Sequence, residues 1–384
     1  MTFDFATAGR ILFGPGRVGE VGNLASDLGN RALLVTGASV ERAAPLEAIL
    51  HEAGLETHLY TVDREPTTDT AREGRQRAIE VECDIVISFG GGSVIDAGKA
   101  ISILIPNGED PLDFLEVIGR GQPLLEPPLP FIAIPTTAGT GTEVTRNAVL
   151  ASKEHKVKVS LRNASMLPRI ALVDPELTHS MPPEVTASTG LDALTQLIEP
   201  FLSIRRNPMV DAFCREGLTR GAKSLLRAYQ NGDDAEARFD MSLASMMGGL
   251  ALANAGLGAV HGFAGPFGGM FPAPHGAICA SLLPHVMRVN LSALEKKGDD
   301  GDLMARFIEV ARILTGDQKA TASEGVEWLS ALCMKMEIPR LGFYGLIEDD
   351  FQDLTKKASV SSSMKGNPIP LSSEEMREIL ELAL

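Results

Sequence analysis

The first 135 residues alternate short β-rich runs with stretches of helical spacing, and this alternation constrains the fold more than any other feature. Strands joined by helices need crossover connections, so they pair in parallel, and such sheets carry helices on both faces. The expected class is therefore a doubly wound, Rossmann-like α/β domain, with ligands beyond the carboxyl ends of the strands. The pattern predicts strands at 31–36, 56–62, 85–89 and 130–134, and helices at 41–53, 69–82 and 93–105.

The sequence pattern changes after a polar turn at 178–182. From about Pro183 onward, long amphipathic or wholly apolar helical runs replace the strand pattern. We therefore expect an α/β domain over 1–180 and an all-α domain over 181–384, a division that also suits a chain of 384 residues. Its last helix should follow Ser372, a serine cap with acidic residues in the first turn.

Charge and cysteine content narrow the functional class. The net charge is −15, from 35 basic and 50 acidic residues, which argues against a nucleic-acid or anionic-membrane partner. The four cysteines are widely spaced without a C-x-x-C pair, which favours a reducing compartment over a disulfide scaffold. The N-terminus lacks the pattern of a signal peptide, and the apolar stretch 248–283 is interrupted by prolines and histidines. We expect a cytoplasmic enzyme with buried core helices.

A run of glycines follows the strand at 85–89. Gly90, Gly91, Gly92 and Ser93 lead into a helix, and backbone N–H groups at such a helix start bind anions. The run matches neither a P-loop nor G-x-G-x-x-G, so a simple tight turn is the alternative. A second loop, 135–143, is rich in threonine and glycine and suits phosphate or ribose contacts, with a flexible polar turn as its alternative.

Together, the motifs of this chain resemble the iron-containing (group III) alcohol dehydrogenase family. The resemblance runs in order along essentially the whole chain. It rests on the glycine run with Asp96 and Lys99, on 135–145 (PTTAGTGTEVT), 174–178 (DPELT) and 190–193 (GLDA), on His261-Gly and Pro-His275-Gly, and on 367–371 (NPIPL). It implies an N-terminal domain that binds NAD or NADP, a helical domain that holds a metal, and a substrate cleft between them.

Carried over by position, the resemblance assigns a cofactor site. It implies pyrophosphate binding by Gly90, Gly91, Gly92 and Ser93, phosphate and nicotinamide contacts by Thr136, Thr137 and Thr140, a place near the nicotinamide for Asp96, and one near the ribose for Lys158. Many NAD-preferring members have an acidic residue at the position of Gly37, which repels a 2′-phosphate. Glycine here removes that repulsion, and Ser39 with Arg42 suits a phosphate, so NADP is allowed but not demanded.

The resemblance also implies a metal site made by Asp192, the residue four later, His261 and His275, with the two histidines in catalytic positions. Spacing of i, i+4 puts Asp192 and Gln196 on one helix face. Family members usually have histidine where this chain has Gln196, and an amide oxygen is a weaker donor than imidazole. Three interpretations are open: a retained metal with Gln196 as weak or outer ligand, a lost metal with histidines that bind the substrate oxygen, or plain core histidines.

A second departure lies at Gly265, four residues after His261, where many members have histidine.

The leading hypothesis is an NAD(P)-dependent enzyme that interconverts an alcohol with an aldehyde or ketone, assisted by Fe²⁺ or Zn²⁺. The alternative is metal-independent reduction of an oxoacid, as in the related maleylacetate reductases. A dehydroquinate-synthase-like lyase and a non-catalytic dinucleotide-binding protein fit less well. Family analogy suggests a homodimer or larger homo-oligomer.

Overall fold

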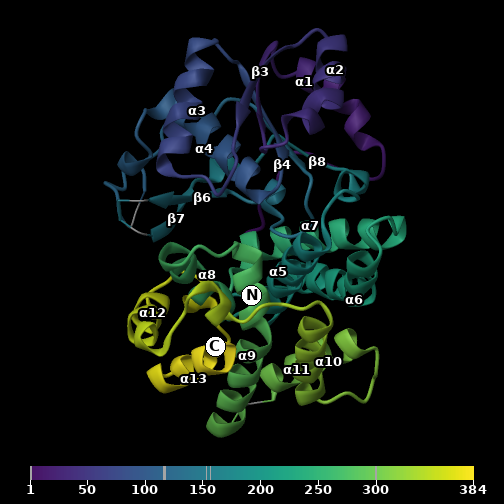
Figure 1. Ribbon diagram of the computed structural model, residues 1–384, viewed down its shortest axis with the longest axis vertical. Coiled ribbons are helices and arrows are strands. Elements are labelled where there is room, and N and C mark those ends of the chain that lie inside the picture. Colours follow the sequence, from purple (N-terminus) through teal and green to yellow (C-terminus); the bar gives the residue numbers. More distant parts are fainter. Residues whose placement is uncertain (1, 116–117, 153, 156, 299–300) are drawn as a thin grey trace. The chain divides into compact units, whose positions relative to one another are not determined.

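The computed structural model describes residues 2–384 except 116–117, 153, 156 and 299–300, and it divides into two compact units (Figure 1). The first, here called the α/β unit, consists of Ala6–Thr137 and Gly141–Thr178. The second, the helical unit, consists of Met1–Phe5, Ala138–Thr140 and His179–Leu384. The main change of unit thus falls between residues 178 and 179. The short segment 138–140, which the sequence interpretation placed in the first domain, groups with the helical unit.

A six-stranded sheet forms the centre of the α/β unit. Its order is β1-β8-β5-β4-β2-β3, and every neighbouring pair is parallel, which confirms the predicted fold class. Periodicity does not reveal β1 and β8, because three and four residues are too few to establish a pattern. The strands are β1 (Ile11–Phe13), β2 (Arg31–Thr36), β3 (Glu56–Thr61), β4 (Ile85–Gly90), β5 (Phe131–Pro135) and β8 (Ile170–Val173).

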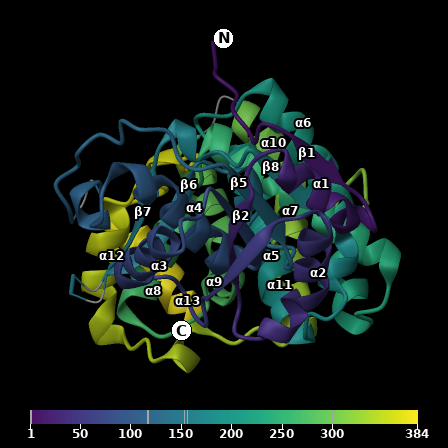
Figure 2. The same ribbon diagram turned by 90° about the horizontal axis from the view of Figure 1, so that it is seen from above.

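Helices cover both faces of this sheet, as Figures 1 and 2 show. Alternate residues of a strand point to opposite faces, so Leu34 and Ile87 pack against one helix pair, and Leu33 and Val86 pack against the other. The first pair is α1 (Val21–Ser26) and α2 (Ala44–Glu52), and the second is α3 (Thr68–Glu80) and α4 (Gly92–Asn107). An antiparallel hairpin that the sequence analysis did not predict, β6 (Asn147–Ser152) and β7 (Val157–Arg162), lies beside α4.

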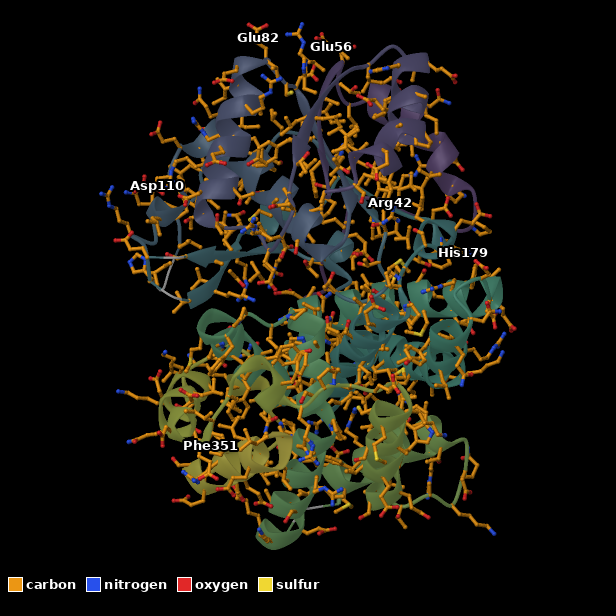
Figure 3. The ribbon with its side chains drawn as sticks, in the orientation of Figure 1. Arg42, Glu56, Glu82, Asp110, His179 and Phe351 are labelled. Carbon is orange, nitrogen blue, oxygen red and sulfur yellow. The ribbon has the colours of Figure 1, made fainter. Side chains whose placement is uncertain are left out.

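The two strands that precede the glycine-containing turns are neighbours in the sheet. Thr36 of β2 pairs with Phe89 of β4, so the turns that follow them begin side by side. The helix after β2 packs on one face and the helix after β4 packs on the other. Adjacent strands whose helices leave on opposite faces define a topological switch point, where doubly wound sheets bind their ligands. Figure 3 labels Glu56 and Glu82 near the amino ends of β3 and β4, and Arg42 toward the opposite end of the unit.

The helical unit packs around one large apolar core. Ser372 caps the last helix, its hydroxyl accepting from Glu375 N while the Glu375 side chain accepts from Ser372 N, as the sequence predicts. The apolar stretch 248–283 lies in three of the helices. One of them, α9 (His275–Lys297), is long and apolar enough to cross a membrane, but 83% of its most apolar 18-residue stretch is buried inside the protein, as in a core helix. The helices are α5 (Pro183–Leu202), α6 (Pro208–Gln230), α7 (Ala235–Ala255), α8 (Ala259–Met270), α9 (His275–Lys297), α10 (Asp302–Thr315), α11 (Ala322–Lys335), α12 (Phe351–Ser359) and α13 (Ser373–Ala383).

Candidate active site

Three helices of the helical unit bring four potential metal ligands together. Asp192 comes from α5, His261 from α8, and His275 and Cys279 from the first turns of α9. One ligand atom of each lies within 4.8 Å of every other. Asp192 Oδ1 is 3.3 Å from His261 Nε2 and 4.0 Å from His275 Nε2. The two histidines that sequence analysis selected therefore lie beside the predicted carboxylate rather than in separate parts of the core.

Glu199 holds His261 in one orientation. The two residues are buried, and Glu199 Oε2 accepts a hydrogen bond from His261 Nδ1 at 2.7 Å. A carboxylate can only accept, so the proton of a neutral imidazole stays on Nδ1 and the Nε2 lone pair is directed to the cluster. Sequence analysis missed Glu199. The available signal was its spacing, because it lies seven residues, or two turns, after Asp192 on the same helix.

The start of α8 is fixed by two acceptors. Val260 N donates to Glu199 Oε1 at 2.7 Å, and Ala259 N donates to Asn367 Oδ1 at 3.1 Å. A Cβ atom at Gly258 would lie 2.9 Å from Glu199 Oε1 and 3.0 Å from Asn367 Oδ1, so glycine allows this close approach. Glu199 thus sets both the first turn of α8 and the ring of His261, which couples the backbone to the cluster.

Gln196 contacts the cluster through Asp192. Its Nε2 donates to Asp192 Oδ2 at 2.8 Å, which leaves Asp192 Oδ1 facing the histidines. Asp192 Oδ1 and Gln196 Oε1 are both buried, and neither makes a hydrogen bond. Buried acceptors without a donor are costly, and a cation bound between the histidines would satisfy Asp192 Oδ1. A set of carboxylate, imidazole and thiol donors fits a divalent transition metal.

Burial and the neighbouring histidines set the protonation of Asp192 and Cys279. Burial raises the pKa of Asp192, but the interactions with His261 and His275 outweigh burial and hold this pKa below its ordinary value. Burial raises the pKa of the Cys279 thiol to about 12. Without a cation, Asp192 is therefore the anion of the cluster and Cys279 is a neutral thiol.

Gly265 lies one turn after His261 on α8. A Cβ atom at this position would meet nothing within 4 Å, so the missing imidazole is not replaced there by another packed side chain. By contrast, a Cβ atom at Gly262 would lie 2.9 Å from Met364 Cε. A larger residue at 262 would therefore need Met364 to shift, whereas the space at 265 is open.

In the α/β unit, the predicted cofactor loops meet at the switch point. Gly37 follows β2 directly, and Ser39 precedes the short 3-10 helix Val40–Ala43. Gly90 ends β4, and α4 begins at Gly92, with no side-chain cap on its first turn. A Cβ atom at Gly90 would lie 2.6 Å from Val94 Cγ2, so this turn needs glycine. Ser93, in the first turn of α4, is part of the same loop.

The threonine loop lies against the glycine loop. Thr136 N donates to Gly90 O at 2.9 Å, and a Cβ atom at Gly91 would lie 3.3 Å from Thr137 Cγ2. These four residues therefore form one continuous surface at the carboxyl ends of β4 and β5. Thr140 belongs to the segment that groups with the helical unit.

Two other predicted cofactor residues are already engaged. Asp96 Oδ1 accepts from Thr142 Oγ1 at 2.6 Å, and Asp96 Oδ2 accepts from Val149 N at 3.0 Å. Lys158, on β7, forms an ion pair with Glu65. Both side chains thus hold parts of the α/β unit together.

Lys99, one turn after Asp96, is a structural residue that sequence analysis did not recognise. Its buried Nζ donates to Thr142 Oγ1 at 2.9 Å, to Thr145 Oγ1 at 2.8 Å and to Asn147 O at 3.0 Å. Burial lowers the pKa of Lys99 to about 8, and it raises the pKa of the nearby Glu143 to about 7. Lys99 therefore ties α4 to the loop that precedes the β6–β7 hairpin.

Comparison with known proteins agrees with this architecture. The family pattern of iron-containing alcohol dehydrogenases matches residues 8–175, and the C-terminal pattern of the Fe-containing alcohol dehydrogenase family matches residues 186–384. The 1,3-propanediol dehydrogenase of Klebsiella pneumoniae is 35% identical over 390 residues, which cover 99% of this chain and 98% of the relative.

Solved structures show the same similarity. A crystal structure of a 1,3-propanediol oxidoreductase has a TM-score of 0.93 and 32% identity, with 100% of both chains covered. The sulfoacetaldehyde reductase of Bifidobacterium kashiwanohense, solved with NAD⁺, has a TM-score of 0.88 and 27% identity, covering 100% of this chain and 99% of the other. The family uses NAD(P) and a divalent metal, which confirms the cofactors expected from the sequence. The chain belongs to the iron-containing alcohol dehydrogenase family and is an NAD(P)-dependent oxidoreductase that acts on alcohols.

Proposed function

We propose that this enzyme interconverts a small alcohol and its aldehyde or ketone with a divalent cation held by Asp192, His261 and His275. The observation that carries the assignment of these residues is the buried Asp192 Oδ1, which has no hydrogen-bond donor and lies 3.3 Å and 4.0 Å from the two imidazole nitrogens. When bound, the cation polarises the substrate oxygen as a Lewis acid and the nicotinamide carries the hydride.

The residues of the chain orient these groups. Glu199 holds His261 with Nε2 toward the cluster, and Gln196 holds Asp192 by its Oδ2. Fixed donors need no reorganisation when charge develops on the substrate oxygen, which is the main electrostatic benefit of such a site. Asp192 and His261 are buried, whereas the His275 side chain is 36% exposed, so His275 is the ligand that solvent and substrate reach most readily.

The α/β unit supplies the cofactor site. Gly90, Gly91, Gly92 and Ser93 would receive the pyrophosphate at the start of α4, and Thr136 and Thr137 would contact the phosphates and the nicotinamide side. Gly37 leaves the 2′ position free of negative charge, and Ser39 and Arg42 follow in the same turn, so both NAD and NADP are accepted. Because Asp96 and Lys158 already have protein partners, we assign them to positioning the loop and hairpin around the cofactor.

Residue 265 does not take part in proton transfer. Glycine has no ionisable group, and the space around its α-carbon is open. The proton that leaves or enters the substrate oxygen therefore travels by water, by a hydroxyl of the cofactor or by His275.

We further propose a cytoplasmic homodimer or larger homo-oligomer that acts on a small-molecule substrate, and light scattering of the purified protein tests the oligomeric state.

Oxidation of NADH and NADPH by a panel of small aldehydes and ketones tests the function. We expect turnover that stops after exhaustive chelation and returns with Zn²⁺ or Fe²⁺. Asp192→Asn should lose at least 100-fold in kcat/KM, because it removes the anionic ligand. Asp353→Asn, an exposed substitution on α12 in the same unit, is the matched control and should keep full activity. Unchanged turnover after chelation would show that the metal has no role in the reaction.

A further inference from the structure

The sulfur of Cys279 is the fourth potential ligand atom of the cluster, beside Asp192, His261 and His275. Cys279 lies one turn after His275 on α9, so both side chains leave the same face of that helix. Cys279 Sγ is 3.7 Å from His275 Nε2 and 3.8 Å from His261 Nε2. Cys279 is buried, and its thiol has two imidazoles and a carboxylate as its polar surroundings.

We propose that Cys279 is the fourth metal ligand, a thiolate that takes the place of the imidazole absent at position 196, and that it makes the centre select Zn²⁺ over Fe²⁺. This inference rests on the proposed function only in requiring a cation at the cluster. It adds a ligand of different chemistry and a different metal preference.

The donor distances agree with a tetrahedral site. Bond lengths of about 2.1 Å for nitrogen and oxygen and about 2.3 Å for sulfur give edges of about 3.4 Å between N and O and about 3.6 Å between N and S. The observed edges are 3.3 and 4.0 Å for Asp192 Oδ1 to the two histidines, and 3.8 and 3.7 Å for Cys279 Sγ to the same nitrogens. Small side-chain shifts would shorten the two longest edges, from Asp192 Oδ1 to His275 Nε2 and from Cys279 Sγ to His261 Nε2.

Gln196 is the rival for the fourth position. Its Oε1 is buried without a donor and its Nε2 is held by Asp192, so the amide is fixed one turn from the carboxylate. An amide oxygen is neutral and is preferred by hard cations, whereas thiolate is anionic and is preferred by zinc. Within the described residues, Cys279 is therefore the strongest remaining donor at the cluster.

Charge balance favours the same assignment. When the cation binds, the sulfur forms a metal–sulfur bond and the thiol proton passes to solvent. Carboxylate and thiolate then neutralise a divalent cation, whereas one carboxylate with three imidazoles leaves a net positive charge. Because Asp192, His261 and Cys279 are all buried, a neutral centre is the less costly one.

Cobalt substitution tests the ligand directly. Full-length protein, stripped of metal and loaded with one equivalent of Co²⁺, should show an intense near-ultraviolet thiolate-to-cobalt charge-transfer band beside its visible bands. Cys279→Ser should keep the visible bands and lose the charge-transfer band. Cys333→Ser is the matched control, because Cys333 lies on α11 and its thiol contacts Ala280 O of α9 instead of the cluster. Gln196→Ala should retain the band.

Metal preference and wild-type spectroscopy complete the test. Competition between Zn²⁺ and Fe²⁺ should favour zinc in the wild type. Cys279→Ser should lower zinc affinity by roughly tenfold or more, because even the loss of a residue that only hydrogen-bonds to a metal ligand typically costs that much. X-ray absorption of the zinc-loaded wild type should show one sulfur at about 2.3 Å, a measurement that needs no variant to fold.

Two results would overturn the inference. Stoichiometric Co²⁺ or Zn²⁺ without a charge-transfer band or a sulfur neighbour would exclude Cys279 as a ligand while leaving the proposed function intact. Failure of the wild type to bind either cation, together with chelator-resistant oxidation of NADH or NADPH, would overturn both.

Discussion

Glu199 offers the sharpest test of how the fold controls the metal site. In Glu199→Gln the volume is kept, but one carboxylate oxygen becomes an NH₂ group. The two oxygens now accept from Val260 N and from His261 Nδ1, each at 2.7 Å. Whichever way the amide turns, a donor then faces a donor, because both partners are N–H groups.

The size of the effect follows from the bond that is lost. Val260 N belongs to the backbone and cannot change, so the amide oxygen is expected to keep that bond and the NH₂ group to face His261. A buried hydrogen bond to a charged group contributes about 1.5–3 kcal/mol, and each 1.4 kcal/mol is tenfold, so metal affinity should fall roughly 10- to 100-fold. The neutral ring also gains freedom to place its proton on Nε2, which removes the lone pair from the cluster.

The assay is competition for Zn²⁺ against a chromophoric chelator, with circular dichroism as the check on folding. Glu378→Gln, an exposed substitution on α13, is the control and should bind Zn²⁺ as the wild type does. Unchanged affinity in a folded Glu199→Gln protein would refute the assignment of Glu199 as the residue that orients His261. A loss of stability with unchanged affinity would show that Glu199 serves α8 alone.

Three further predictions address other parts of the protein. Gly265→Ala should raise the free energy of unfolding by about 0.4–1 kcal/mol, because its Cβ atom would meet nothing within 4 Å. Gly262→Ala should lower it, because its Cβ atom would lie 2.9 Å from Met364 Cε and 3.3 Å from Met364 Cβ; equal melting shifts would contradict this. Glu143→Gln should remove a pH dependence of the free energy of unfolding. Burial raises the Glu143 pKa from 4.5 to about 7, so the stability from its neutral form is fully present below pH 4.5 and is lost as the pH rises through 7, about 3 kcal/mol at most. Melting temperatures of wild type and variant that run parallel from about pH 5 to 8 would refute it. Gly37→Asp should shift the ratio of kcat/KM toward NAD over NADP by roughly tenfold or more, because the carboxylate repels a 2′-phosphate. The variant should fold, since a Cβ atom at Gly37 would have no neighbour within 4 Å. An unchanged ratio would place the ribose elsewhere.

The sequence was enough to predict the architecture of the α/β unit. Buried parallel strands are continuous apolar runs and their covering helices are amphipathic, so the period of the pattern carries the class of the fold. The glycines at 37 and 90 mark the turns that the strand order places side by side. The short strands β1 and β8 were not predicted, because three or four residues show no period and their pairing joins distant parts of the chain. The local hairpin β6–β7 was also not predicted.

The candidate site was predictable only in part. The sequence by itself determined Asp192, His261 and His275 as candidates, because motifs along the chain carry them in order, and it determined that imidazole is missing at Gln196 and Gly265. Only the tertiary structure brought in Glu199 and Cys279. Neither belongs to a recognisable motif, and a side chain becomes a ligand or its support through contacts between helices that are distant in sequence. The physical reason is that sequence periodicity fixes which face of a helix a residue occupies, whereas the packing of α5, α8 and α9 decides which faces meet.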